Sequence, residues 1–435
     1  MRNSCDRVLG FIEENDIKFV RLFFCDIFGR PKSLAVMADQ LPRVFDAGFG
    51  FDVSAVDGFM NIADEDLLLF PQPETFCVLP WRPAMGGVGR MFCDIRYPGG
   101  KPFEGDGRYL LKRAVSDAAA AGYRFKFRPK CEFYLFELDE KGGYTTIPHD
   151  RAGYFDVPPL DRGENIRREI CLTLEELDDC PESCHHEKGP GQNQIDCRMR
   201  NALESADNFV SFKTVVRTIA AREGLFACFM PKPLADISGS GLHVDISIFK
   251  EGSDVALSMG PEIRGAIAGI LDHIEEMTLF FNTTTNSYLR FGSFDAPRFI
   301  SWVDGNRSQL LLAKHALDGS ARLLLRSPDP LCNPYLAYTL LIEAATEGIT
   351  AGRTPCAPSD FDLSTAPEEV LRSYRHLPDN LGAAVDVAQK SAFLRKHISL
   401  PVLEKVLESK RSEWEACRKA RERHQYEMDS YFAAL

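Results

Sequence analysis

The sequence predicts an α+β protein in two domains, a smaller one over residues 1–100 and a larger one over residues 101–435. Two kinds of segment predict the class. Several short segments alternate apolar and polar residues with the period of two of a strand, and long segments later in the chain have helical spacing. The division follows from residues 97–102, YPGGKP, whose Gly and Pro make them the best linker candidate in the chain.

The amino-acid composition and net charge argue against several classes of protein. The 435 residues are 45% apolar and 26% charged with a formal net charge of -12, which is ordinary for a globular chain with room for two domains. No basic block stands out, so we expect no nucleic-acid and no membrane partner. The first twenty residues do not resemble a secretory signal, and no apolar run nears roughly 18 residues. We therefore expect a cytoplasmic protein, with its 13 scattered cysteines reduced and mostly buried.

In the first domain, residues 17–37 predict two strands around the turn at residues 27–30. Val20, Leu22 and Phe24 are separated by residues of the opposite face, as in a sheet with one side against a core. Residues 48–54 form a Gly-rich loop that contains Asp52, and residues 91–95 predict another short strand.

In the second domain, alternation predicts strands at 125–138, 241–249 and 321–326. Each has a polar face, which inside a large domain is typical of a cleft or of a solvent-facing surface. The residues on these faces are Arg128, Lys130, Glu132 and Tyr134; His243, Asp245 and Ser247; and Arg322, Leu324 and Arg326. Helices are expected at 109–121, 208–223, 261–282, 334–348, 367–376, 381–396 and 401–427.

The stretch from Cys184 to Asp196, CHHEKGPGQNQID, contains two histidines, a glutamate, three polar amides and an aspartate around a Gly-Pro-Gly segment. Its Gly-Pro-Gly segment predicts a turn, so the polar groups on the two sides can converge into a metal or acid/base site. A solvated loop is the alternative. Cys180, Cys184, His185 and His186 form a possible zinc set, although their spacing fits no common zinc pattern.

Eleven segments taken together resemble the glutamine synthetase family along nearly the whole chain. They occur in the family's order and are the loop at 51–52, CEFYLF at 131–136, GYFD at 153–156, HHE at 185–187 with GQ at 191–192, DN at 207–208, FMPKP at 229–233, GSGLH at 239–243, NSYLR at 286–290, AP at 296–297, NRS at 306–308, and PDP at 328–330 with NPYL at 333–336.

The resemblance implies a β-grasp N-terminal domain and a catalytic domain whose curved antiparallel sheet forms a funnel. It also implies a ring homo-oligomer, often of two stacked hexamers, with sites shared between subunits; hexamer, decamer and dodecamer stay open. Asp52 matches the aspartate that reaches into the next subunit and helps bind ammonium. Family enzymes are ligases of nitrogen metabolism that use ATP and Mg²⁺ or Mn²⁺ to join ammonia or an amine to the γ-carboxylate of glutamate.

The expected metal ligands are depleted in this chain. The first ion's three glutamates correspond to Glu132, Glu187 and Gln194, and the second ion's ligands to Lys130, His243 and Leu324. The formal charge of this ligand set changes from -5 to -1. Hard divalent cations need carboxylate oxygens. The sequence therefore predicts that metal binding is weak or lost and that catalytic competence is in doubt.

The remaining expected site residues fall into two groups. The amino-acid and phosphate side is mostly kept, and the nucleotide side is partly lost, because Leu312, Gly319 and Asp245 stand where the family has two basic residues and a histidine. The expected substrate or phosphate residues are Gly239, His243, Arg290, Arg307 and Arg326, with Asp295 as the flap residue. The expected nucleotide residues are Glu182, Ser247 and Arg322.

Three functions remain open from the sequence. The first is a working ligase that uses one metal ion, or Lys130 in place of the second ion. The second is an impaired homologue that acts as an oligomeric binding or regulatory protein for an amino acid or amine. The third is acid/base chemistry by Lys130, Glu132 and Asp245 in the same funnel. For Lys130 itself, a plain ion pair with Glu132 is the alternative to a catalytic role.

Overall fold

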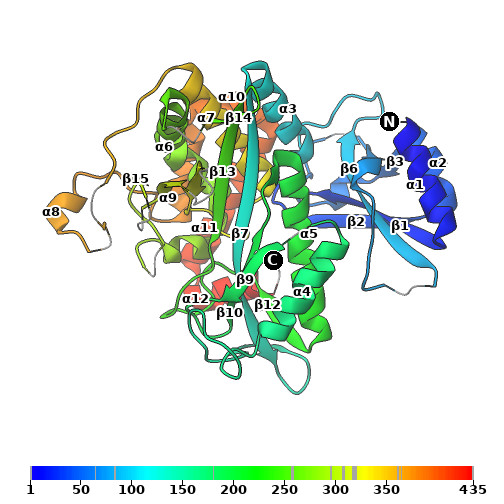
Figure 1. Cartoon of the computed structure of the whole chain (residues 1–435), viewed down its shortest axis with the longest axis horizontal. Helices are drawn as coiled ribbons and strands as arrows, with labels where there is room; N and C mark the ends of the chain where they lie inside the picture. Colours follow the sequence, from blue (N-terminus) through cyan, green and yellow to red (C-terminus); the bar gives the residue numbers. More distant parts are fainter. Residues whose placement is uncertain are drawn as a thin grey trace.

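The computed structural model describes residues 2–63, 65–82, 85–179, 181–255, 259–293, 296–305, 309–315, 321–359, 362–363 and 365–433. Two sheets organise the molecule, a small one near the N-terminus and a large one through the middle (Figure 1). The α+β class is confirmed, because helices accompany two separate sheets along the chain. No described helix is both long enough and apolar enough to cross a membrane.

The small sheet has six strands in the order β2-β1-β6-β4-β3, with β5 paired to β6. The predicted hairpin is confirmed, because β1 and β2 pair antiparallel and Val20 and Leu22 are fully buried. β1 and β6 run parallel at the centre. Its elements are α1 (Arg2–Glu14), β1 (Ile17–Cys25), β2 (Pro31–Met37), α2 (Leu41–Ala47), β3 (Phe49–Phe51), β4 (Leu67–Pro71), β5 (Cys77–Val78) and β6 (Gly87–Arg96).

The large sheet has eleven strands, and its main path is β15-β16-β17-β13-β7-β10-β9. All of its pairings are antiparallel except that of β15 with β16. The central strand β7 pairs with β13 over nine residue pairs. Its strands are β7 (Tyr123–Leu138), β8 (Tyr144–Pro148), β9 (Pro181–His186), β10 (Gln192–Cys197), β11 (Arg200–Asn201), β12 (Leu225–Cys228), β13 (Leu242–Lys250), β14 (Ser253–Asp254), β15 (Trp302–Asp304), β16 (Leu311–His315) and β17 (Ala321–Leu325).

The helices of the larger domain pack beside this sheet, with α3 and α5 against β7. They are α3 (Gly107–Ala120), α4 (Glu164–Glu176), α5 (Ala202–Arg222), α6 (Pro261–Phe281), α7 (Pro334–Thr350), α8 (Glu368–Leu371), α9 (Leu381–Lys390), α10 (Ala392–His397), α11 (Leu400–Lys419) and α12 (Arg423–Glu427). The helix expected at 381–396 is two helices, because the Ser391 hydroxyl accepts a hydrogen bond from the Leu394 amide and starts α10.

Three helices lie where no helix was predicted from the sequence, namely α1, α2 and α4. The helix α1 buries Val8 and Ile12, and α4 buries Ile166, Ile170 and Leu174. Each set has the four-residue spacing of one helical face. The helix expected at 367–376 is shorter and covers only α8.

Arg108 joins the two sheets. It lies on α3 and is almost completely buried. Its guanidinium donates to Asp94 on β6 at 2.6 Å and to Asp207 on α5 at 2.8 Å. Asp207 also accepts from the Tyr335 hydroxyl at 2.6 Å. Because a buried charge is costly unless it is paired, this network fixes the small sheet against the helices behind the large one.

Candidate active site

The Cys184–Asp196 stretch folds as a hairpin of β9 and β10, as the Gly-Pro-Gly turn predicted. Asn193 lies opposite His186, and the Glu187 amide donates to the Gln192 carbonyl oxygen at 2.8 Å. The polar groups do converge, because His185 Nε2 lies 3.0 Å from the Glu187 carboxylate.

The two histidines of this hairpin point to opposite faces of β9. His185 lines a cavity, whereas His186 is buried and hydrogen-bonds Asp150 at 2.9 Å and the Glu187 carbonyl oxygen at 2.7 Å. Neighbouring strand residues cannot share one tetrahedral ion in this arrangement. The zinc alternative is therefore wrong for this pair, and Cys180 lies outside the described residues.

His186 has a hydrogen-bond partner for each of its two ring nitrogens inside the protein. Burial opposes the charged ring, but the hydrogen bonds to Asp150 and to the Glu187 carbonyl outweigh it and raise the pKa of His186. The same contact holds the pKa of Asp150 at about 2, against the effect of its burial. Asp161 lies near both groups, yet its carboxylate is taken by Arg167 and by the Gly163 amide. We interpret this cluster as structural.

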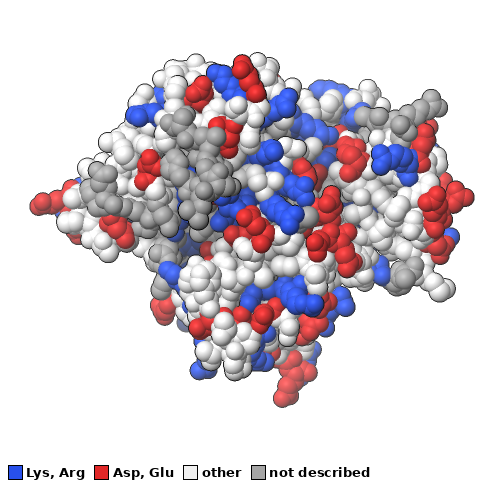
Figure 2. All heavy atoms as spheres, viewed as in Figure 1, with Lys and Arg blue, Asp and Glu red and all other residues white. Residues whose placement is uncertain are grey.

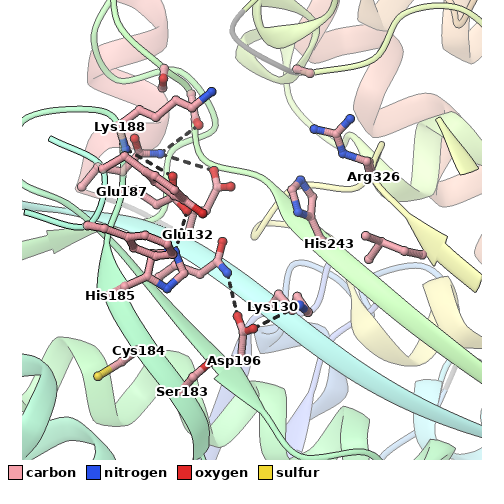
Figure 3. Close-up of a pocket in the computed structure, with 18 of the residues that line it drawn as sticks. Lys130, Glu132, Ser183, Cys184, His185, Glu187, Lys188, Asp196, His243 and Arg326 are labelled. Carbon is pink, nitrogen blue, oxygen red and sulfur yellow. Dashed lines mark hydrogen bonds and ion pairs between the residues drawn. The ribbon is translucent and has the colours of Figure 1, made fainter. Parts of the chain in front are cut away.

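A cavity of about 670 Å³ opens on one face of the large sheet. Figure 3 shows Glu132 and Glu187 together on one side of it, with His243 and Arg326 across from them. Its walls come from β7, β9, β10, β13, β16 and β17 and from adjoining loops. The lining residues predicted from the sequence are Lys130, Glu132, Glu187, Gly239, His243, Arg290 and Arg326, together with Gln194 and Leu324.

Two carboxylates form one side of the cavity. Glu132 accepts hydrogen bonds from the Gly241 amide at 2.8 Å and from the Gln192 side chain at 3.3 Å. Burial, and then the negative charge of Glu187, raise the pKa of Glu132 to about 8. Crowded carboxylates with a raised pKa are typical of a divalent-cation site without its cation. Glu132 and Glu187 therefore fit one hard divalent ion.

Lys130 lines the cavity from β7. Its ammonium lies 3.1 Å from Asp196 and 4.0 Å from Asp245. The expected alternative, an ion pair with Glu132, is wrong. Residues two apart on one strand are about 6.6 Å apart, whereas Asp196 on β10 lies directly opposite Lys130. His243 on β13 lies opposite Lys130 on the other side.

Positively charged side chains surround His243 in the cavity. Burial, and then the charges of Arg326, Arg290, Lys130 and Lys314, lower the pKa of His243 well below its usual range. Its ring is therefore neutral at physiological pH. The position next to it that was expected to supply a carboxylate holds Leu324, and Lys130 places an ammonium there instead. This donor set does not fit a second divalent ion.

Arg290 is almost completely buried without a carboxylate partner among the described residues. Within the described part of the chain, its guanidinium donates to the carbonyl oxygens of Ser327 and Pro328, each at 3.4 Å. Two glycines make room for it. A Cβ on Gly239 would lie 2.7 Å from Arg290 Cγ, and one on Gly241 would lie 2.8 Å from Arg290 Nη2.

Apolar side chains form the wall towards the expected nucleotide side. Leu312 on β16 is directly opposite Leu324 on β17, and the two pack with Val303 in a separate buried cluster. The other expected nucleotide residues lie off the cavity. Glu182 is bound to Arg128 at 2.5 Å, Ser247 is buried on β13, and Arg322 is half-buried on β17.

Three further expected residues are not among the residues that line this cavity in the described part of the chain, and two of them lie outside it. Asp52 is exposed in the small domain, where it accepts from the amide and hydroxyl of Ser54. Asp295 and Arg307 lie outside the described residues.

Sequence reasoning missed Lys314, which lines the cavity from β16. The signal was present, because Lys314 is two residues from Leu312 and so shares its strand face. It also missed Arg128 as the partner of Asp245, whose carboxylate the Arg128 Nε reaches at 2.7 Å.

A small sheet joined to a large, mostly antiparallel sheet, with paired glutamates and a buried arginine lining a cavity of the large sheet, defines a two-domain α+β class of protein. Residues 16–98 match the glutamine synthetase β-grasp domain, and residues 104–431 match the glutamine synthetase catalytic domain. The chain belongs to the glutamine synthetase family.

Several relatives share nearly the full length. The chain is 40% identical to the glutamine synthetase of Clostridium saccharobutylicum, over 98% of this chain and 97% of that one. It is 37% identical to the glutamine synthetase of Thermus thermophilus, over 98% of each chain. A solved structure described as a GmaS/ADP complex superposes with a TM-score of 0.86 at 28% identity, over 97% of this chain and 98% of that one.

Proposed function

We propose that this member of the glutamine synthetase family binds an acidic amino acid of the glutamate class and does not carry out two-metal ATP-dependent ligation. One observation carries the proposal: the Lys130 ammonium lies opposite His243, where the second ion's ligands are expected. An ammonium at that place repels the cation that the reaction would need.

The proposal depends on how strongly the Lys130 ammonium weakens the binding of a second divalent ion. Two unit charges about 4 Å apart interact by about 4 kcal/mol at an effective dielectric of 20. Replacing an attractive carboxylate by a repulsive ammonium changes the sign of such a term. Each 1.4 kcal/mol corresponds to about a tenfold change in affinity, so several orders of magnitude are lost.

Arg290 is the proposed anchor of the ligand's carboxylate. Burial lowers its pKa, and Asp329 and Glu132 only partly oppose that shift. A bound carboxylate would supply the missing partner through the paired N–H groups of the guanidinium. Gly239 provides the space, and the neutral His243 ring can donate or accept one hydrogen bond beside it.

The assembly and location are also proposals. We propose a cytoplasmic ring homo-oligomer in which Asp52 reaches the neighbouring subunit, since it is exposed and lies off the cavity of its own chain. The division into residues 1–100 and 101–435 is supported by the separate sheets on either side of it.

A second candidate function is ligation of ammonia or an amine to glutamate with a single divalent ion. The paired Glu132 and Glu187 favour it, because they fit one Mg²⁺ or Mn²⁺. Lys130 would then supply part of the second ion's field, and ATP would bind against the depleted nucleotide side.

The test uses the purified full chain. Isothermal titration calorimetry with glutamate should show saturable binding in EDTA, and Arg290→Gln should abolish it. Phosphate release with ATP, Mn²⁺, glutamate and a panel of amines should stay at background. Steady phosphate release that depends on Mn²⁺ and an amine would replace the proposal by the second candidate.

A further inference from the structure

Two cysteines from different elements meet beside the cavity. Cys184 lies on β9, is exposed and lines the cavity, whereas Cys171 lies on α4 and is half-buried. Their thiols are hydrogen-bonded to each other, and neither is part of a disulfide. Figure 3 shows the Cys184 sulfur directed away from Glu132 and His243. The thiol pair therefore lies beside the expected ligand groups and is separate from them.

The packing of α4 on the β9–β10 hairpin holds the two cysteines together. Arg167 on α4 is almost completely buried and donates to the side-chain oxygen of Asn193 on β10. Two residues further along β10, Ile195 lies opposite Cys184. Residues four apart on a helix share one face, so Arg167 and Cys171 both face the hairpin.

The surroundings of Cys184 favour its thiolate. The hydrogen bond with the Cys171 thiol, together with the nearby charge of Arg167, lowers the pKa of Cys184 to about 6 against the effect of burial. The same hydrogen bond, and then burial, raise the pKa of Cys171. Arg167 Nε is buried without a hydrogen-bond partner in the part of the chain that the structure describes, and a thiolate would supply one. Cys184 is therefore the nucleophile of the pair.

Positive charge near Cys184 selects the kind of reagent that reaches it. Figure 2 shows Lys and Arg side chains gathered near the middle of the face over the large sheet, with acidic groups beside them. Lys130, Lys188, Lys314 and Arg326 line the cavity together with Cys184. Basic groups in a hollow raise the local concentration of an anionic reagent.

We propose that Cys184 and Cys171 form a reversible disulfide by exchange with an anionic low-molecular-weight disulfide. The Cys184 thiolate attacks one sulfur of that reagent, so its S–S bond breaks, a mixed disulfide forms on Cys184 and one thiolate leaves, which takes up a proton. The Cys171 sulfur then attacks Cys184 Sγ, and its proton goes to the second leaving thiolate. Two protein thiols are oxidised, and one small disulfide is reduced to two thiols.

The disulfide would join an edge strand to a helix. β9 ends the main path of the large sheet, and His185 and Glu187 of the cavity wall follow Cys184 directly. Hydrogen-bonded thiols need only a small movement to reach the roughly 2.05 Å of a disulfide bond. The bond closes a short loop from residue 171 to residue 184, which restricts the unfolded chain. We therefore expect oxidation to raise the thermal midpoint.

The first experiment exposes the purified full chain to glutathione disulfide, followed by digestion after glutamate residues and mass spectrometry. This digestion places Cys171, Cys180 and Cys184 on three different peptides. We expect the Cys171 and Cys184 peptides to be joined, with glutathione on Cys184 as the earlier product. Dithiothreitol should separate them again.

Single variants distinguish the two roles. In Cys171→Ser, the glutathione adduct on Cys184 should accumulate, because the second attack is lost. In Cys184→Ser, the half-buried Cys171 should acquire no glutathione. Reduced Cys171→Ser should unfold at about the midpoint of the reduced unmodified chain, and oxidation should raise only the midpoint of the unmodified chain.

A measurement without any variant guards against misfolding. Iodoacetamide at pH 7 should alkylate Cys184 at least tenfold faster than Cys356. Cys356 is the matched control within the chain, because it is also exposed, whereas partial burial of its thiol raises its pKa.

Three results would overturn the inference: no glutathione on Cys184, a disulfide that joins Cys184 to Cys180 in place of Cys171, or equal alkylation rates for Cys184 and Cys356. The inference does not depend on the proposed function. If glutamate fails to bind in EDTA while the Cys171–Cys184 disulfide forms, only the proposed function is wrong.

Discussion

Leu312 and Leu324 face each other across β16 and β17, and each is at most 4% exposed. The family resemblance expects an arginine and a glutamate at these two positions. The two changes are therefore coupled in space: an opposite-charge pair has become an apolar cross-strand pair. Such a pair supports the sheet and offers nothing to a nucleotide phosphate or a cation.

Leu324→Glu should destabilise the protein by about 2–4 kcal/mol, because it buries a carboxylate against Leu312 and Val303. Adding Leu312→Arg should recover part of that loss by restoring an ion pair. Urea unfolding of both single variants and the double variant measures the coupling. Leu172→Glu on the exposed side of α4 is the control, with an expected effect within about 0.5 kcal/mol. Strictly additive changes would contradict the pairing.

The triple change Lys130→Glu, Gln194→Glu and Leu324→Glu should rebuild a two-ion site. We expect the unmodified chain to bind at most one Mn²⁺ and the triple variant to bind two, because only the variant has enough carboxylates. Metal analysis after gel filtration counts the ions. Mn²⁺ should also raise the thermal midpoint of the variant more than that of the unmodified chain. Two ions on the unmodified chain would contradict our account of Lys130.

Gly239→Ala should weaken glutamate binding at least tenfold. The added Cβ would lie 2.4 Å from the Pro231 carbonyl oxygen and 2.7 Å from Arg290 Cγ, so Arg290 has to move. Gly10→Ala on α1 is the matched control, because its Cβ meets nothing within 4 Å. It should leave binding unchanged and stabilise the helix by roughly 0.5–1 kcal/mol. Normal glutamate affinity in Gly239→Ala would show that Arg290 is not the anchor.

Asp179 should make stability depend on pH. Burial raises its pKa to about 7, partly opposed by the charges of Arg90 and Arg200. The ordinary value is 3.8, so between about pH 4 and 7 the folded chain keeps a proton that the unfolded chain releases. Stability therefore falls as pH rises through this window and levels off above it.

Asp179→Asn should remove that decline, with a gain on the order of 4 kcal/mol at pH 8 and little change at pH 4. Urea unfolding at several pH values measures it. Asp178→Asn is the control, because Asp178 is exposed and its positive φ of 61° suits asparagine. Equal pH slopes for the unmodified chain and Asp179→Asn would rule out the buried acid.

The sequence predicted strand faces well and strand neighbours poorly. Alternation placed Lys130 and Glu132 on one face, and both line the cavity. The partner of Lys130 was wrong because it depends on the register of β10 against β7, which no local pattern encodes. Lys314 was missed for a related reason, since its proximity to Lys130 needs two intervening strands to be placed first.

For the helices too, the sequence predicted what a local pattern encodes and missed what depends on tertiary packing. The long apolar spacing of α6 was predicted almost to its ends, from Pro261 to Asn282 against an observed Pro261–Phe281. The break at Ser391 was missed, because a single serine can continue a helix or cap the next one. Tertiary packing of α9 and α10 decides between them.

The His186 ring joins the Glu187 carbonyl oxygen to the Asp150 carboxylate through hydrogen bonds that need no ligand in the cavity. This side of the cavity is consequently held in place by contacts within the chain itself. Little conformational freedom remains to be lost there when a ligand arrives, so association on that side is governed by the exchange of water for ligand atoms and not by rearrangement of the backbone.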